Sequence, residues 1–306
     1  MTIYLCSKRE DDVRRVKVVT DARIQSSSSR RSRRPHLVLF TTMADLPERS
    51  LIHRYTIANW AAHSPDVLPI LFLPPNSSRH MTSMAQDAIR KGWIILRTPR
   101  FLSGLPVLKD MFRIAERKAA DNMASFIGYA NADILFDANL TPTLLTIQKL
   151  RKGFWTNVFV VGRRAEVNVS LLTDQVTCLG CLTQIRNDGT IFFGAGQDYF
   201  ITVPDQFPWQ HIPDFVVGNR AYDNRISVET FQWHYDVIDV SRTLLAVHQI
   251  GDRNRFITPG RSHDYHLAAG AELTKGDISH APWYTEFSGC VTATNGKCQI
   301  RLRRRL

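Results

Sequence analysis

The chain has 306 residues, a formal net charge of +11, 44% hydrophobic residues and 22% charged residues. This composition excludes wholesale disorder, and the length excludes a small disulfide-stapled module. Eight arginines lie in two short runs, 30–34 and 301–305, so everything else carries a formal net charge of only about +3. A nucleic-acid-binding fold would instead spread Lys and Arg over one folded face.

The first 35 residues contain a serine run, many charges and little apolar periodicity, which predicts a disordered basic segment with a short strand near residues 16–19. From residue 36 onward, short apolar runs alternate with segments of helical spacing. Strands are expected at 36–40, 66–73, 93–97, 126–130 and 157–162. Helices are expected at 48–62, 81–92, 106–119, 140–151 and 225–235. Pro69 predicts an edge or bent position for the second strand.

Strands that alternate with helices of this length predict βαβ units, and therefore an α/β fold with a mostly parallel sheet flanked by helices. Beyond residue 165 the alternation gives way to short strands, aromatic residues and prolines. We therefore expect one domain over residues 36–270, divided into a regular half (36–165) and a less regular half that shapes the acceptor site (166–270). A C-terminal extension, 271–306, carries the second basic run as a tail.

The sequence contains no membrane or export signal that we can identify. No apolar run reaches the roughly 18 residues of a spanning helix, and the N-terminus lacks the apolar core of a secretory signal. As given, the sequence predicts a soluble cytoplasmic protein. A missing N-terminal anchor would place it in the secretory lumen instead.

Two of the five cysteines, Cys178 and Cys181, form a Cys-x-x-Cys pair, while Cys290 and Cys298 lie far downstream. A four-cysteine zinc site would need a more closely spaced second pair. We therefore expect ordinary thiols at these positions rather than a zinc site.

Polar residues follow several of the predicted strands, at the end of the sheet where α/β proteins bind ligands. Among them, Asp133 comes directly after a buried strand. A carboxylate at this edge suits a hard divalent cation, since Mg²⁺ takes one or two carboxylates together with substrate phosphates. The alternative is that Asp133 only caps a turn.

The stretch GLPVLKDMFRIAERKAADNMASFIGYANADILF, residues 104–136, resembles the GT-A glycosyltransferases, and more narrowly a glycosyltransferase-like group of that fold. These enzymes use nucleotide sugars and a metal-binding Asp-x-Asp motif. The likeness continues in the family's order and spans about residues 36–266. The further blocks are VGRR (161–164), QDYF (197–200), IPDFVVGNRAYDN (212–224), VIDVSRTLLAVHQ (237–249) and HDYH (263–266).

The resemblance implies a GT-A (Rossmann-like) fold in which residues 36–165 bind the nucleotide sugar. It implies a glycosyltransferase that moves a sugar from a nucleotide diphosphate to a hydroxyl of a glycan, protein or lipid acceptor. The implied cofactor is Mn²⁺ or Mg²⁺, held by Asp133 and His263, which neutralises the departing diphosphate. For His263 taken alone, a surface loop position is the alternative.

Four further residues are expected on the donor side. Thr41 and Thr42 end the first strand, where GT-A proteins usually meet the nucleotide. Arg54 either reaches the same pocket or lies on a solvated helix face. Asn131 stands where a full Asp-x-Asp motif has its first aspartate, so metal binding depends on Asp133.

Two arginines and two aspartates are expected near the reacting groups. Arg163 and Arg164 either pair with phosphates or the acceptor, or support one of the aspartates. Asp223, placed just before helix 225–235, is the favoured general base, and capping that helix is its alternative role. Asp198 is the second candidate base, and we expect it to bind the acceptor.

Two departures from the family pattern leave other functions open. Arg225 replaces an aromatic residue after the Asp-Asn pair, and Arg164-Ala165-Glu166 replaces an Arg-aromatic-Asp pattern. A catalytically degenerate binding protein is therefore the main alternative. A nucleic-acid-associated protein, driven by the two arginine runs, is disfavoured because the chain has no recognised reading motif.

Overall fold

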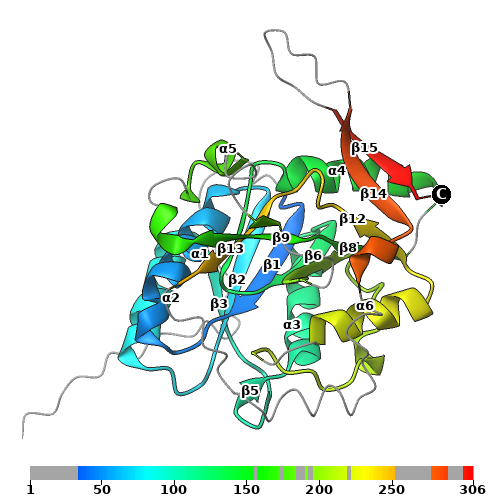
Figure 1. Ribbon diagram of the computed structural model, residues 1–306. Coiled ribbons are helices and arrows are strands. Elements are labelled where there is room, and N and C mark those ends of the chain that lie inside the picture. The colour runs from blue at the N-terminus through cyan, green and yellow to red at the C-terminus, as the bar shows by residue number, and fades with distance from the viewer. Residues whose placement is uncertain are drawn as a thin grey trace, which may run out of the picture.

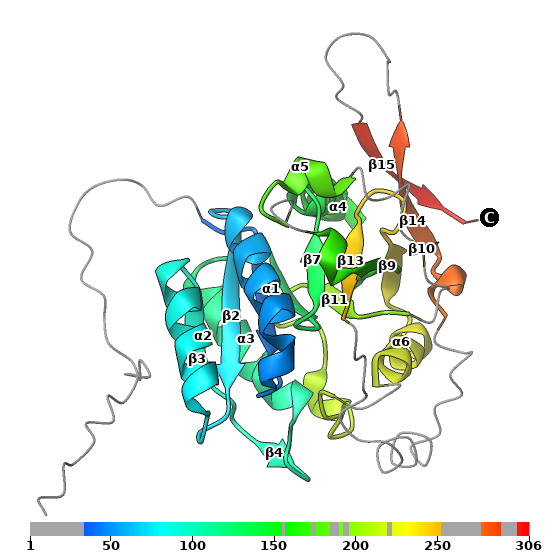
Figure 2. The ribbon, with the colours of Figure 1, turned by 60° about the vertical axis from the view of Figure 1, so that its left-hand side comes forward.

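The computed structural model describes residues 34–154, 157–172, 176–183, 190–191, 196–218, 222–251, 277–288 and 299–305. Most of the predicted N-terminal segment, its short strand, and His263 lie outside the described residues. Within them, a nine-stranded mixed sheet forms the centre of the molecule and helices cover both of its faces (Figure 1, Figure 2).

The strands of the large sheet lie in the order β15 (Gln299–Arg304), β14 (Trp283–Ser288), β12 (Asp236–Asp239), β8 (Val158–Val161), β11 (Tyr199–Thr202), β6 (Phe126–Ala130), β1 (Leu37–Thr42), β2 (Val67–Leu73) and β3 (Ile94–Arg97). The strands from β6 to β3 are parallel to one another, and so are β8, β12 and β14. Strand β11 lies between these groups and is antiparallel to both of its neighbours. The predicted α/β fold with a mostly parallel sheet is therefore confirmed.

The helices are α1 (Ser50–Ala62), α2 (Arg79–Arg90), α3 (Leu108–Asp121), α4 (Leu140–Phe154), α5 (Leu179–Leu182) and α6 (Tyr222–Gln232), with short 3₁₀ turns η1 (Pro47–Arg49), η2 (Val169–Leu171), η5 (Trp209–His211) and η7 (Ile278–His280). Successive residues of β1 divide the core into two layers, because strand side chains alternate between faces. Leu37 and Leu39 pack with residues of α1, α2 and α4. Val38 and Phe40 pack with residues of α3 and α6 on the other face.

Helix α2 shows how the sequence fixes these elements. The Ser78 side chain accepts a hydrogen bond from the Met81 amide at 3.2 Å and so caps the start of the helix. The buried residues of α2 recur at helical spacing and are Met81, Met84, Ala85 and Ala88. Gly92 follows the end of the helix with φ of 87°, a conformation that favours glycine.

A second, smaller sheet lies next to the carboxyl end of β6 in the large sheet. Its order is β10 (Thr190–Ile191), β9 (Arg164–Asn168), β13 (Ala246–Ile250) and β7 (Ile134–Phe136). Because β7 follows β6 after three residues, the chain passes from the large sheet into the small one through residues 131–133. A two-stranded hairpin, β4 (Phe101–Leu102) and β5 (Leu105–Pro106), stands apart from both.

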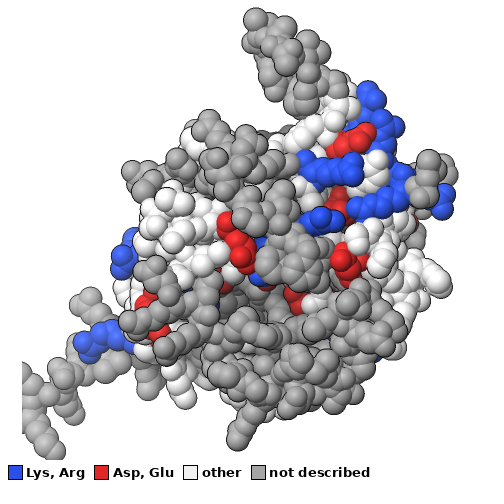
Figure 3. Space-filling model, in the orientation of Figure 1, with Lys and Arg blue, Asp and Glu red and all other residues white. Residues whose placement is uncertain are grey.

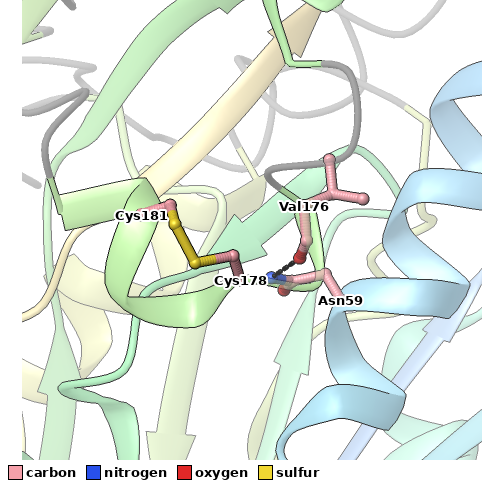
Figure 4. The surroundings of a disulfide bond; sticks show 4 residues. All are labelled: Asn59, Val176, Cys178 and Cys181. Carbon is pink, nitrogen blue, oxygen red and sulfur yellow. Dashed lines mark hydrogen bonds between the residues drawn. A yellow bond between two sulfur atoms is a disulfide. The ribbon is translucent and has the colours of Figure 1, made fainter.

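Three expectations need correction. Of the edge or bent position expected for β2, the edge position is wrong, although β3 pairs with it only from Ile70 onward, which leaves Pro69 without a partner on that side. Helix α6 begins three residues earlier than predicted, which puts Asp223 inside its first turn. Cys178 and Cys181 are not free thiols, because a disulfide joins them (Figure 4).

The second arginine run forms part of a strand. Strand β15 pairs antiparallel with β14 and so extends the large sheet. Basic side chains gather over these two strands in the space-filling view (Figure 3). Arg304 lies over the ring of Trp283, and Arg305 over that of Tyr284. Within the described residues, we find no helix with the length and hydrophobicity needed to cross a bilayer.

Candidate functional site

Three predicted site residues meet at the carboxyl edge of the large sheet. Strand β11 runs against β6 and β8, so its beginning lies where those two strands end. Asp198, just before β11, therefore lies beside Asn131, just after β6, and the Asn131 amide donates to the Asp198 carbonyl at 2.9 Å. Arg164, the first residue of β9, forms an ion pair with the carboxylate of Asp198.

Asn131 forms hydrogen bonds with three neighbouring side chains. Its Nδ2 donates to Oδ1 of Asp198 at 2.8 Å. Its Oδ1 accepts from the hydroxyls of Tyr129, at 2.7 Å, and Tyr222, at 2.8 Å. These two bonds use both lone pairs of the amide oxygen, which leaves none for a metal. An aspartate here could not donate to Asp198 and would set two carboxylates against each other.

Both carboxylate oxygens of Asp198 have partners. Oδ1 accepts from Asn131, and Nη1 of Arg164 pairs with Oδ2. Nη2 of Arg164 lies 3.0 Å from Oε1 of Glu166, two residues along β9. Of the two roles expected for Arg164, the described contacts are those of a residue that supports Asp198.

Arg163 lies elsewhere. Its amide donates to Oγ of Ser241 at 2.7 Å, just beyond β12. Burial raises the pKa of Asp277, but hydrogen bonds from Ser279 and the charge of Arg163 outweigh it and lower that pKa. The positive charge of Arg163 therefore acts toward Asp277 and η7.

Asp133 lies between the side chains of Arg49 and His248. Nη2 of Arg49 is 2.5 Å from its Oδ2, and Nε2 of His248 is 3.5 Å from the same oxygen. Burial opposes ionisation of Asp133, but the hydrogen bond and charge of His248 and the charge of Arg49 hold its pKa well below the usual range. Burial also opposes protonation of His248, yet Asp133 raises the histidine pKa overall. The three side chains form a partly buried charge cluster.

The backbone around Asp133 is fixed from two sides. Oγ1 of Thr56, on α1, donates to the carbonyl of Ala132 at 2.7 Å. The Gln249 amide, on β13, donates to the carbonyl of Asp133 at 3.0 Å. The Gln249 side chain in turn donates to Oγ1 of Thr56 at 3.0 Å. The turn that carries Asp133 is thus held by both the helical layer and the small sheet.

Asp223 is partly buried in the first turn of α6. Burial raises its pKa to about 7, the negative charge of Asp198 adds to this, and Arg164 partly opposes it. Its Oδ1 accepts from the Asn224 amide at 2.9 Å. A carboxyl group that titrates near neutrality can take up a proton from a substrate at physiological pH.

The other predicted donor-side residues form no described bond with the carboxylates of Asp133 and Asp198. Thr41 and Thr42 end β1 and are buried, with Oγ1 of Thr41 3.4 Å from the Thr42 carbonyl. Arg54 is exposed on α1. Among the described residues, the hydrogen bonds and ion pairs of the Asp133 and Asp198 side chains include none of these three.

Sequence reasoning missed Arg49 and His248. His248 gave a signal, because it interrupts the apolar run of β13 with a titratable side chain. Arg49 gave almost none, since it lies in a short 3₁₀ turn seven residues after β1. The two departures from the family pattern also have partners within the chain. Glu166 pairs with Arg164, and Arg225 pairs with Glu229 one turn along α6 at 2.6 Å.

The donor atoms at this edge suit a cation that arrives together with a substrate. Oδ1 of Asp133 is buried and has no hydrogen-bond partner among the described residues. One carboxylate oxygen can hold Mg²⁺ or Mn²⁺ only when phosphates and water supply the other ligands. The described part of the chain contains no group of three His, Cys, Asp or Glu side chains that could hold a metal ion.

No model of a known protein family matches the chain, and no curated protein matches it. Solved structures do. A Desulfovibrio desulfuricans protein described as a nucleotide-diphospho-sugar transferase is 9% identical with a TM-score of 0.42, over 80% of this chain and 99% of that one. The chain resembles nucleotide-sugar transferases in fold.

Two other similar structures hold ligands. The mannosyltransferase PcManGT of Pyrobaculum calidifontis, solved with GDP-Man and Mn²⁺, is 11% identical with a TM-score of 0.43, over 80% of this chain and 64% of that one. Glucosyl-3-phosphoglycerate synthase of Mycobacterium tuberculosis, solved with Mn²⁺, UDP and phosphoglyceric acid, is 13% identical with a TM-score of 0.34, over 88% and 87%. At these values the likeness concerns the fold and carries no information about the ligands of this chain.

Proposed function

We propose that the protein transfers a sugar from a nucleotide-diphosphate donor to an acceptor hydroxyl at the carboxyl edge of the large sheet. The main support is the charge cluster of Arg49, Asp133 and His248. It lies at the edge where the Asn131–Asp198 contact joins β6 to β11. Such an edge is where α/β sheets bind ligands, and paired cations suit a diphosphate.

Sugar transfer leaves a diphosphate anion, so the site has to stabilise developing negative charge. Arg49 can supply a positive group, since its side chain is 24% exposed and guanidinium groups bind phosphate oxygens in pairs. In the proposal, Arg49 turns from Asp133 to the donor diphosphate when the donor binds. That movement also uncovers Asp133, whose Oδ1 is otherwise buried. His248, whose pKa Asp133 raises, supplies a second positive charge when its ring is protonated.

Asp133 is the residue proposed to hold a divalent ion, through Oδ1, with His263 kept as the expected second ligand. A Mn²⁺ or Mg²⁺ ion, when bound there, supplies a Lewis acid for the leaving diphosphate. Thr41, Thr42 and Arg54 remain the proposed contacts of the nucleotide.

On the acceptor side, Asp223 is proposed to take the proton of the attacking hydroxyl. Its pKa near 7 suits this role, whereas both oxygens of Asp198 are already engaged. Asp198 then acts as a positioning residue, held between Asn131 and Arg164. The acceptor itself, a glycan, protein or lipid hydroxyl, is left open by these groups.

One observation favours the alternative of a binding protein without turnover. The Asn131 amide oxygen is fully used by two tyrosine hydroxyls, so within the described Asn131–Asp133 turn only Asp133 remains for a metal. Hydrolysis and transfer assays with a panel of nucleotide sugars separate the two functions. Ligand binding with no product from any donor supports the alternative.

Binding is tested by thermal unfolding with UDP- and GDP-sugars in the presence of Mn²⁺. A ligand at about 100 times its Kd stabilises by about 2.7 kcal/mol, which raises Tm by roughly 5–10 °C for a domain of this size. Asp133→Asn should abolish the shift. Asp87→Asn, which removes the surface ion pairs of Asp87 with Arg90 and Lys91, should retain it. No shift with any nucleotide sugar in the unmodified protein contradicts the proposal.

The role of Arg49 is tested separately. Arg49→Ala should weaken nucleotide binding about tenfold or more, because a charge-assisted hydrogen bond is worth about 1.5–3 kcal/mol. Arg90→Ala is the matched control, since Arg90 is an exposed arginine on α2. Isothermal titration calorimetry measures both. Equal affinity of the two variants removes Arg49 from the proposed donor site.

A further inference from the structure

The Cys178–Cys181 disulfide lies at the protein surface and closes a very small ring. The two Cα atoms are 5.2 Å apart across the start of α5 (Figure 4). Cys178 is exposed and Cys181 is half-buried, so a reagent in solution reaches the bond from the Cys178 side. A disulfide that spans only three positions removes little freedom from the unfolded chain, and its entropic contribution to stability is correspondingly small.

The segment around the disulfide is held in place by other contacts. The Val176 carbonyl accepts from Nδ2 of Asn59, on α1, at 2.9 Å, as Figure 4 shows. The Leu179 carbonyl accepts from the Ala138 amide at 3.1 Å. Each of these bonds joins the segment to a different part of the fold, and neither involves a sulfur atom.

Two further contacts anchor the end of α5. Leu182 is fully buried in a small apolar cluster. Oγ1 of Thr183 donates to Oδ2 of Asp137 at 3.2 Å. With anchors on both sides of the cysteines, the fold does not need the S–S bond to keep α5 in position. The bond can therefore open while the protein stays folded.

The apolar cluster links α5 to the candidate site. Besides Leu182 it contains Ala165 of β9 and Val247 of β13. Strand side chains alternate, so the neighbouring residues Glu166 and His248 face away from the cluster. They meet each other on the other face, where Nδ1 of His248 lies 3.7 Å from Oε1 of Glu166. The disulfide segment therefore packs behind the small sheet that presents these two site residues.

We propose that Cys178 and Cys181 form a thiol–disulfide exchange site that is reduced and reoxidised in the folded protein. The reductant is a dithiol or a pair of small thiols. This inference is independent of sugar transfer, because it concerns groups on the opposite face of the small sheet.

The exchange proceeds in two balanced steps. A reductant thiolate attacks Sγ of Cys178, which forms a mixed disulfide and releases Cys181 as a thiolate. The second thiolate of the reductant then attacks the reductant sulfur of the mixed disulfide, and Cys178 leaves as a thiolate. Two electrons pass to the protein, its two thiolates take up protons, and the reductant leaves as a disulfide. Oxidised glutathione reverses the sequence.

The experiment treats the native protein with dithiothreitol, traps thiols with an alkylating reagent and maps the peptide that contains Cys178 and Cys181 by mass spectrometry. Peptide mapping separates this pair from Cys6, Cys290 and Cys298. We expect both cysteines of the pair to become alkylated without denaturant, and to be protected again after treatment with oxidised glutathione. Reduction should lower Tm by about 4–8 °C and leave the circular dichroism of the folded protein unchanged.

The control is the double variant C178S/C181S, whose Tm should match that of the reduced protein and should not respond to dithiothreitol. Four results overturn the proposal. The pair remains oxidised until denaturant is added, its reduction unfolds the protein, or the oxidised protein lacks the bond between these two cysteines. A response to dithiothreitol that persists in the double variant assigns the effect to another cysteine and equally overturns it.

Discussion

Replacing Asp223 with asparagine tests the charge state of the proposed general base. The fold raises the pKa of this carboxyl from 3.8 to about 7, first by burial and then through Asp198. A gap of about three pKa units corresponds to about 4 kcal/mol of free energy. Because Asp223 is only partly buried, solvent screening makes this an upper bound.

The direction of the pH dependence follows from which state, folded or unfolded, binds the Asp223 proton more tightly. The folded state keeps the proton up to about pH 7, whereas the unfolded chain loses it above about pH 4. Stability therefore falls as the pH rises through this window, and the full penalty is present above pH 7. Asparagine carries no charge and keeps an oxygen that can accept from the Asn224 amide.

The assay is urea unfolding of the unmodified protein and Asp223→Asn between pH 4.5 and 8.5. The variant should exceed the original's free energy of unfolding by no more than about 1 kcal/mol at pH 4.5 and by up to about 4 kcal/mol at pH 8.5. If Asp223 is the base, transfer activity should also fall by roughly 10²–10⁴-fold. A stability difference that does not change with pH refutes the reasoning about Asp223.

Three further changes have expected outcomes. Asp133→Asn should lower the free energy of unfolding at pH 5–6, and this loss should shrink below pH 4, because the ion pairs with His248 and Arg49 depress the pKa of Asp133. Urea unfolding in the two pH ranges measures the loss, and a loss that grows in acid contradicts the prediction. Asn131→Asp should cost about 1–3 kcal/mol of unfolding free energy, because the Asp198 carboxylate loses a donor and gains a like charge; an unchanged urea midpoint would exclude this. Gly128→Ala should cost about 1–3 kcal/mol by the same measurement, because a Cβ there lies 2.7 Å from Cγ1 of Ile201; full stability would mean that β11 gives way easily.

The regular half of the fold was predictable from local pattern. Apolar runs of strand length alternate with segments whose apolar residues have helical spacing, and each such pair predicts one parallel βαβ crossover. Helix α2 shows why the boundaries were nearly right, since Ser78 and Gly92 mark its ends chemically. The second half was less predictable, because β9, β13 and β7 form a sheet whose partners lie far apart in the sequence.

The candidate site was predictable only in part. Asn131 and Asp133 were found because they follow a buried strand, and Asp198 because it lies in the QDYF block. The contact between Asn131 and Asp198 depends on the antiparallel direction of β11, which no local sequence pattern predicts. Arg49 was missed for a similar reason: its contact with Asp133 joins residues 84 positions apart.

The arginines of β15 have a consequence for solubility. This strand forms one end of the large sheet, and its outer backbone groups face no other strand among the described residues. An open strand of this kind can template pairing with a second molecule, and like charges along it oppose such pairing. Shortening the chain before Gln299 would leave β14 as the last strand and would remove Arg304 from the ring of Trp283, whereas Tyr284 would lose Arg305 but keep Arg242 over its ring. We therefore expect the arginine run of β15 to oppose self-association through this edge of the sheet.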